Sequence, residues 1–308
     1  MRIMRKSAFQ RTMFPLSSRK MRMTLVEPQP APAAMTSLAS GKNRDTENFP
    51  VGSLLIRPDL RAHIHALYNF ARAADDISDH SLLDPTEKIR RLNHFADVLV
   101  DDKAEDIPEA AALRRSLKET RITVQHSLDL LTAFKRDATQ LRYRDWNDLL
   151  DYCRYSASPV GRHVLALHGV GMEAWPAGDA LCSALQIINH IQDCADDYRQ
   201  LDRVYIPQDM LARHGGQIAD LSHDCWTTGL AAALRDMLDA LEPMLIEARR
   251  LPALVPDWRL KCETSVIAVL AERLIRLLRR RDPLCDNVKL GKISIAGATL
   301  TGLVRAWL

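Results

Sequence analysis

The amino-acid sequence predicts an all-α protein with a single helical domain over residues 45–290. From Pro58 onward, apolar side chains recur at the three- to four-residue period of an amphipathic helix. Runs that alternate Val, Ile or Thr with polar residues between hairpin turns do not occur, and no internal repeat divides the chain. We therefore expect a helical bundle with a central apolar cavity.

The expected helices follow from spacing and from start signals. The first follows Pro58 and has one apolar face, formed by Leu60, Ile64, Leu67, Ala71 and Ala74. The second begins at Asp84, which can cap it, with Pro85 in the first turn and Glu87 completing a capping box. Later helices are predicted at 108–119, 123–140, 145–172, 177–202, 223–250 and 257–281. Pro159 should kink or break the segment 145–172.

The two ends of the chain differ from the helical domain. Residues 1–44 are predicted to be a disordered leader that is rich in arginine and poor in acids at its start. This composition is like that of a transit peptide but lacks an amphipathic repeat, so a start at Met35 stays open. Residues 291–308 form an apolar tail that Arg305 interrupts, shorter than the ~20 residues that cross a bilayer. Two placements are open for this tail: on a membrane surface, or against the body.

Composition narrows the classes of function. A net charge of +3 over 308 residues is too small to indicate a nucleic-acid partner. The 6 cysteines are scattered without a Cys-x-x-Cys pair, which argues against a zinc or disulfide framework. Reduced thiols are typical of a cytoplasmic protein. The histidines show no ligand spacing.

A first acidic motif lies on the first predicted helix. Asp75 and Asp79 are one helical turn apart, so their carboxylates share a face. Arg72 and Tyr68 continue the same stripe toward the amino terminus. A solvated acidic helix end would also explain the two aspartates.

A second motif repeats the pattern and favours a metal site. Asp193 and Asp197 are again one turn apart, and Asn189 and Gln186 precede them on the same face. Carboxylates grouped in this way repel one another unless a cation lies between them. An oxygen-only donor set indicates magnesium, which completes its octahedron with water and phosphate oxygens. The two motifs together therefore predict a diphosphate substrate.

These two motifs, together with the segment Arg203-Val-Tyr205-Ile-Pro207, resemble the squalene/phytoene synthase family over about residues 45–290. The resemblance implies a single-domain isoprenoid synthase bundle and a prenyl diphosphate substrate. It also implies magnesium ligands at Asp75, Asp79, Asp193 and Asp197, with Asn189 and Gln186 nearby. Arg72 and Arg203 would contact the diphosphate. Tyr68 and Tyr205 would line the site, as would Tyr155.

Three local segments are similar to a bacterial, hopanoid-pathway branch of that family. The first contains Asn48 and Phe49, the second runs from Tyr152 through Tyr155 to Gly161, and the third is Ile191-Gln192-Asp193-Cys194. The resemblance implies a carbon–oxygen lyase that ionises presqualene diphosphate and captures the rearranged cation with water. It also implies a functional link to presqualene diphosphate synthase. Because no Gly-x-Gly-x-x-Gly segment occurs, we expect no nicotinamide.

Two alternatives remain at this point. The chain could join prenyl diphosphates as presqualene diphosphate, dehydrosqualene or phytoene synthases do. It could also be a non-catalytic assembly factor of the same fold, in which case eroded aspartates would be expected.

Overall fold

The computed structural model describes residues 57–307. The chain separates into two units, Met1–Ser37 and Leu38–Leu308, and every described residue belongs to the second. The predicted leader at 1–44 and the candidate residues Asn48 and Phe49 lie outside the described residues.

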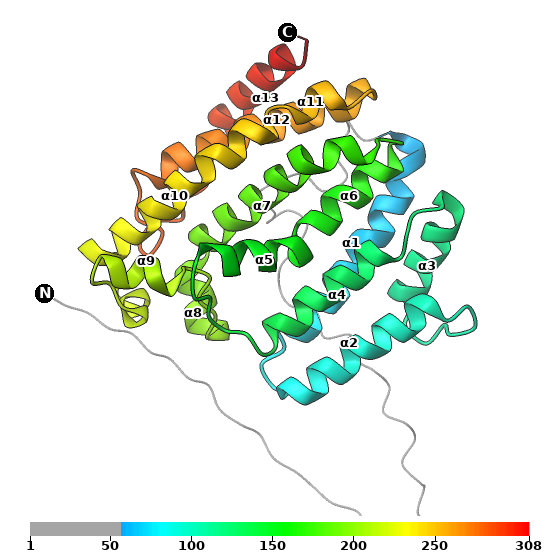
Figure 1. The fold of residues 1–308 in the computed structure, drawn as a ribbon, viewed down its shortest axis with the longest axis horizontal. Coiled ribbons are helices and arrows are strands. Elements are labelled where there is room, and N and C mark those ends of the chain that lie inside the picture. Colours follow the sequence, from blue (N-terminus) through cyan, green and yellow to red (C-terminus); the bar gives the residue numbers. More distant parts are fainter. Residues whose placement is uncertain (1–56, 308) are drawn as a thin grey trace, which may run out of the picture. The chain divides into compact units, whose positions relative to one another are not determined.

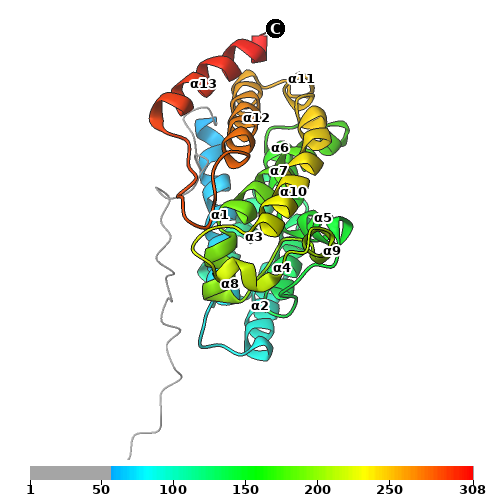
Figure 2. The same cartoon turned by 90° about the vertical axis from the view of Figure 1, so that its left-hand side faces the viewer.

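The described chain is helical, as predicted, and its only β-type pairing is an isolated bridge between Arg142 and Val204. Figures 1 and 2 show the arrangement of the helices. The α-helices are α1 (Arg61–Ser78), α2 (Pro85–Val100), α3 (Pro108–Thr120), α4 (Gln125–Asp137), α5 (Trp146–Ser156), α6 (Ser158–Leu167), α7 (Trp175–Gln192), α8 (Cys194–Leu201), α9 (Gln208–Arg213), α10 (Thr228–Ala248), α11 (Leu251–Leu254), α12 (Trp258–Leu278) and α13 (Lys292–Trp307). Short 3₁₀ turns occur at Pro58–Leu60, Met172–Ala174 and Ile218–Ser222.

The start of α2 follows the prediction in part. Asp84 accepts hydrogen bonds from the backbone N–H groups of Thr86 and Glu87, and Pro85 lies in the first turn. The predicted capping box is wrong, because the Glu87 carboxylate pairs with Arg90 and Arg91 instead. Arg90 and Arg91 lie three and four residues after Glu87, so they bind the carboxylate that a capping box would place on the backbone N–H of Asp84.

Two predicted long helices are broken in the structure. The segment 145–172 divides at Ala157, because Pro159 lies in the first turn of α6 and cannot continue α5. The segment 177–202 divides at Asp193, whose backbone (φ −99°, ψ 7°) leaves the helical region between α7 and α8. The second break falls inside the second acidic motif, with no proline or glycine to announce it.

The apolar tail is a helix that packs on the body. In α13, Gly302 lies against Val266 of α12, and its carbonyl accepts a 2.7 Å hydrogen bond from the Ser265 hydroxyl. A Cβ on Gly302 would lie 2.5 Å from the Val266 backbone, so glycine allows this close approach. Within residues 57–307, no helix is long and apolar enough to span a membrane.

Two hydrophobic clusters hold the helices that carry the candidate site. One surrounds Phe70 on α1 and Phe95 on α2, and the other surrounds Ile187 and Ile188 on α7. α4 and α5 pack on each other, α4 also packs on α1, and α5 packs on α7. The helices that begin the two acidic motifs, α1 and α7, are therefore connected by packing through α4 and α5.

Candidate active site

One cavity of about 300 Å³ brings the two acidic motifs together. Of the candidate residues named from the sequence, the cavity is lined by Tyr68, Arg72, Asp75, Asp79, Gln186, Asn189, Asp193, Asp197, Arg203 and Tyr205. Residues from α1 form one wall and residues from α7, α8 and the following segment form another. The helical spacing in each motif therefore places its polar groups in one shared space.

The first motif is organised by Arg72. Its guanidinium donates to Asp75 at 3.1 Å and to Asp76 at 2.9 Å, one turn along α1. Asp79 follows the last residue of the helix, and its backbone N–H bonds to the Asp75 carbonyl. Asp75 and Asp79 line the cavity with Tyr68, whereas Asp76 does not. The stripe expected from the sequence is therefore present.

The second motif keeps its one-turn register across the break in the helix. Gln186 and Asn189 lie on α7, and the Asp193 N–H still bonds to the Asn189 carbonyl. The Asp197 N–H in turn bonds to the Asp193 carbonyl at 2.8 Å. Both carboxylates line the cavity, and Asp196, between them in the chain, does not.

Arg203 joins the segment after the second motif to the first motif. Its guanidinium donates to the Asp79 carboxylate at 2.5 Å, to the Ser78 carbonyl at 2.9 Å and to the Asp137 carbonyl at 3.0 Å. Burial alone would lower the pKa of Arg203, but the nearby charges of Asp137 and Asp79 raise it, so the group stays cationic. With three of its bonds made to the protein, Arg203 acts as a clamp between segments.

Asp137, at the end of α4, is a buried carboxylate that the sequence analysis missed. It accepts hydrogen bonds from the hydroxyls of Tyr152 at 2.9 Å and Tyr205 at 3.0 Å. Burial raises the pKa of Asp137, whereas the charge of Arg203 opposes that rise. The carboxylate thus fixes the hydroxyls of two aromatic rings that line the cavity.

Tyr155 is not among the residues that line the cavity, whereas Tyr152 is. The Tyr155 ring lies instead beneath the guanidinium of Arg136, whose Cζ is 4.5 Å from the ring centroid. The two tyrosines of α5 are three residues apart and therefore about 60° apart around the helix axis, and only Tyr152 lines the cavity. We therefore correct the assignment from Tyr155 to Tyr152.

His190 also lines the cavity, although its spacing in the sequence does not indicate a site residue. Its ring stacks on Tyr205 with the centroids 3.5 Å apart and the planes 13° apart. Its Nε2 lies 3.0 Å from the side-chain nitrogen of Gln186, and its Nδ1 lies 4.0 Å from an Asp197 oxygen. An imidazole is therefore held between an amide and a motif carboxylate.

The cavity also has an apolar wall. Its apolar lining residues are Ala71, Leu130, Phe134, Val160 and Leu201. We expected a central apolar cavity. The cavity is apolar on one wall only, because charged residues also line it. Such a site suits a ligand with a charged head and a hydrocarbon body.

The donor set fits magnesium. Asp75, Asp79, Asp193, Asp197 and Asn189 offer only oxygen as acceptor, and all of them line one cavity. Among the described residues, the only group of three His, Cys, Asp or Glu side chains with ligand atoms within 4.8 Å lies elsewhere, so the motif carboxylates are spread apart. Magnesium held by one or two carboxylates, with phosphate oxygens between them, matches this spacing.

Comparison with known proteins identifies the relatives of this chain. The squalene/phytoene synthase family profile matches residues 42–294. The hydroxysqualene synthase of Rhodopseudomonas palustris is 44% identical over 274 residues, 88% of this chain and 94% of that protein. The hydroxysqualene synthase of Sinorhizobium fredii is 43% identical over 265 residues, 85% of this chain and 90% of that protein.

Solved structures agree with this result. The squalene synthase of Alicyclobacillus acidocaldarius is 33% identical with a TM-score of 0.68, covering 77% of this chain and 90% of that one. A ligand-bound dehydrosqualene synthase has a TM-score of 0.71 at 21% identity, covering 84% of this chain and 91% of that one. The second likeness concerns the fold alone.

Proposed function

Because this chain belongs to the squalene/phytoene synthase family, we propose that it is a hydroxysqualene synthase. The reaction converts presqualene diphosphate and water to hydroxysqualene and diphosphate, which makes the enzyme a carbon–oxygen lyase. One observation supports this most strongly: hydroxysqualene synthases are 44% and 43% identical over most of this chain and most of their own length. The position of both acidic motifs in the lining of one cavity also supports this function.

The polar wall would bind the diphosphate. Asp75, Asp79, Asp193 and Asp197, with Asn189, would hold magnesium, which when bound would neutralise charge that develops on the leaving diphosphate. Arg72 would add a guanidinium beside the first pair of carboxylates. Arg203 would keep the two motifs in position through its three bonds to the protein, and as a residue of the cavity lining it would also contact the diphosphate.

The aromatic residues would stabilise the cation. When the carbon–oxygen bond to diphosphate breaks, the electron pair leaves with the diphosphate and a cyclopropylcarbinyl cation remains. The rings of Tyr152 and Tyr205 line the cavity, and Asp137 holds both hydroxyls, so the ring orientation is fixed before ionisation. A cation over an aromatic face gains about 0.5–2 kcal/mol, more when water is excluded.

Water would then end the reaction. Its oxygen bonds to the rearranged cation, and one of its protons must leave. His190 is our candidate acceptor, since it is the one histidine in the lining of this cavity among the described residues, beside Gln186. The apolar wall of Leu130, Phe134 and Val160 would exclude water until the rearrangement is complete.

Isotope labelling tests the function directly. The full chain, incubated with magnesium and presqualene diphosphate in ¹⁸O-labelled water without nicotinamide, should release diphosphate and yield an alcohol with one label. Unlabelled product, or products made from farnesyl diphosphate, would overturn the proposal in favour of presqualene diphosphate or dehydrosqualene/phytoene synthesis. If neither diphosphate is consumed, an assembly role of the same fold gains support.

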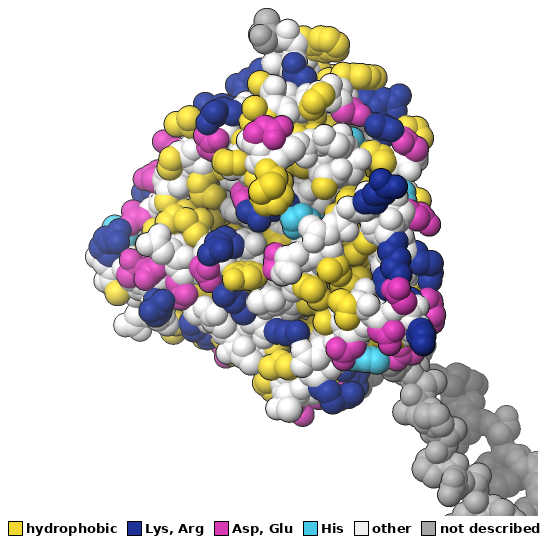
Figure 3. All heavy atoms as spheres, turned by 45° about the vertical axis from the view of Figure 1, so that its right-hand side comes forward, with side chains coloured by type: hydrophobic (Ala, Val, Ile, Leu, Met, Phe, Trp, Pro, Cys, Tyr) yellow, Lys and Arg dark blue, Asp and Glu magenta, His cyan; other side chains and the backbone are white. Residues whose placement is uncertain are grey.

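We further propose peripheral contact with an anionic membrane through α13, which would suit an apolar product. Ile293, Leu300 and Trp307 are 91%, 67% and 75% exposed. Arg276 and Arg280 line a shallow hollow next to Ser294 of this helix. Figure 3 shows hydrophobic and basic side chains together near the carboxyl terminus, while both signs of charge are interspersed over the rest of the visible face. Exposed apolar groups beside cations are typical of interfacial helices.

Vesicle sedimentation tests this contact. The protein should sediment with phosphatidylglycerol vesicles and less with neutral ones, and Leu300→Ser should weaken binding. Equal recovery on both kinds of vesicle would contradict contact with an anionic membrane.

The supply of presqualene diphosphate implies a functional link to presqualene diphosphate synthase, and a shared membrane surface would bring the two enzymes together.

A further inference from the structure

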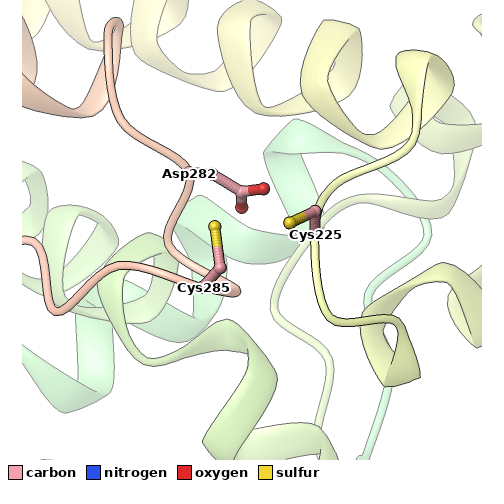
Figure 4. A group of neighbouring side chains, drawn as sticks. All are labelled: Cys225, Asp282 and Cys285. Carbon is pink, nitrogen blue, oxygen red and sulfur yellow. The ribbon is translucent and has the colours of Figure 1, made fainter.

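Two exposed cysteines and a buried aspartate meet outside the candidate active site. The sulfur atoms of Cys225 and Cys285 and a carboxylate oxygen of Asp282 all lie within 4.8 Å of one another. Figure 4 shows the three side chains turned toward a common space. None of them lines the active-site cavity. They come from two loops, one before α10 and one between α12 and α13.

Asp282 holds both of these loops. One of its oxygens accepts the N–H of Trp226 at 2.7 Å, and the other accepts the N–H of Leu284 at 2.9 Å. These amides belong to the residue after Cys225 and the residue before Cys285. The carboxylate therefore fixes the backbone that presents each thiol. Each of its oxygens keeps a further lone pair for a cation.

We propose that Cys225, Cys285 and Asp282 form a zinc site. Two thiolates and one carboxylate are a donor set for zinc, whereas magnesium and calcium prefer oxygen alone. Asp282 and Cys285 have the two-residue spacing by which zinc-binding turns supply two ligands. On binding, both thiols lose their protons to solvent and two sulfur–metal bonds form. Water completes the tetrahedron, since both cysteines are exposed.

The site would fasten the segment before α10 to a loop that contacts the helix pair carrying the second acidic motif. The loop at 282–290 is already joined to α7, because the Gln192 side chain donates a 2.5 Å hydrogen bond to the Val288 carbonyl. Cys285 also lines a depression together with Asp193 and Asp196. Zinc would link this loop covalently to the segment before α10. The expected role is therefore structural support behind the catalytic wall.

Cobalt substitution tests the proposal, because Co²⁺ bound to thiolates absorbs visible light and zinc displaces it. The full chain, reduced and freed of metal, should bind one Co²⁺ with thiolate charge-transfer and tetrahedral d–d bands. Cys225→Ser and Cys285→Ser should each lower the charge-transfer intensity and weaken binding at least ~10-fold, and the double variant should lose the charge-transfer bands. Zinc at a hundredfold excess over its dissociation constant should raise the Tm by about 5 °C or more.

Asp286→Asn is the matched control, because it alters an exposed carboxylate of the same loop outside the cluster and should bind Co²⁺ normally. Circular dichroism confirms that each variant is folded. Three results would overturn the proposal: no thiolate band in the unaltered protein, a thiolate band that persists in the double variant Cys225→Ser/Cys285→Ser, or air oxidation to a disulfide that metal does not prevent. These readouts do not depend on turnover, so they are independent of the proposed reaction.

Discussion

Arg203 donates a 2.5 Å hydrogen bond to the carboxylate of Asp79, a residue 124 positions earlier in the chain. Both groups are largely buried and line the active-site cavity. Since Asp79 belongs to the first acidic motif and Arg203 follows the second, this contact sets the separation of the two motifs. The position of the cavity wall that carries the first motif therefore depends on the wall that carries the second.

Arg203→Lys should lower both stability and turnover. A lysine keeps the charge but cannot reach three acceptors with a planar fork. Breaking one partner of a buried pair costs about 3–5 kcal/mol, and we expect a loss toward the lower end because the charge remains. Thermal unfolding and steady-state rates measure the two effects. Arg199→Lys, on the surface of α8, is the matched control. Equal losses of stability and rate in the two variants would contradict the role of Arg203 in joining the two motifs.

Asp75→Asn and Asp193→Asn should each reduce kcat by roughly 10³-fold, since each removes a carboxylate proposed to hold the magnesium that would stabilise the leaving group. Their circular dichroism should match that of the unaltered protein. Asp196→Asn serves as a control within the second motif, because Asp196 does not line the active-site cavity. Loss of helical signal in either test variant would indicate a structural role for that aspartate.

Removal of divalent metal should abolish turnover, and magnesium should restore it. The physical reason is that four grouped carboxylates repel an anionic diphosphate unless cations lie between them. The measurement is diphosphate release after chelation, followed by separate additions of magnesium and zinc. Undiminished release in excess chelator would contradict the metal assignment. If zinc but not magnesium restored diphosphate release, the assignment of magnesium would be wrong.

The features that could be predicted from the sequence are those set by local spacing. The pair Asp75 and Asp79 shares a face because of the helical period, wherever the helix packs. Pro159 breaks its helix through its own ring. By contrast, the bend at Asp193 has no proline or glycine to mark it, so the sequence predicts one helix where the structure has α7 and α8.

The features that could not be predicted depend on contacts between distant segments. Asp137 meets Tyr152 and Tyr205, which are 15 and 68 residues away along the chain. No periodicity connects such partners. The cysteines at 225 and 285 looked unrelated for the same reason, since only the folded chain brings their loops together.

Tyr152→Phe should slow the reaction more than Tyr155→Phe. The first substitution removes a hydroxyl bonded to the buried Asp137 carboxylate and leaves that acceptor with one partner fewer, a loss of about 1–3 kcal/mol. The second alters a ring outside the cavity lining that packs under Arg136. Rates and melting temperatures of the pair test the reassignment. A larger rate loss in Tyr155→Phe would restore the prediction from the sequence.

His163 makes stability depend on pH. It is fully buried on α6, and neither ring nitrogen has a hydrogen-bond partner. Burial lowers the pKa of His163 from 6.5 to about 4, with the nearby His126 and His63 acting in the same direction. The unfolded chain therefore takes up a proton below pH 6.5 that the folded protein does not accept until about pH 4.

The sign of the effect follows from this difference. The stabilisation from keeping His163 neutral is complete above pH 6.5 and is lost as the pH falls toward 4, by about 3 kcal/mol in total. His163→Phe should remove that component, so the melting temperature of the variant should fall less than that of the unaltered protein between pH 7 and pH 4. His94→Phe is the matched control, because His94 lies near the surface against Asp106. The two melting curves would be parallel across this range if the His163 ring were protonated in the folded state, and that result would reject the argument.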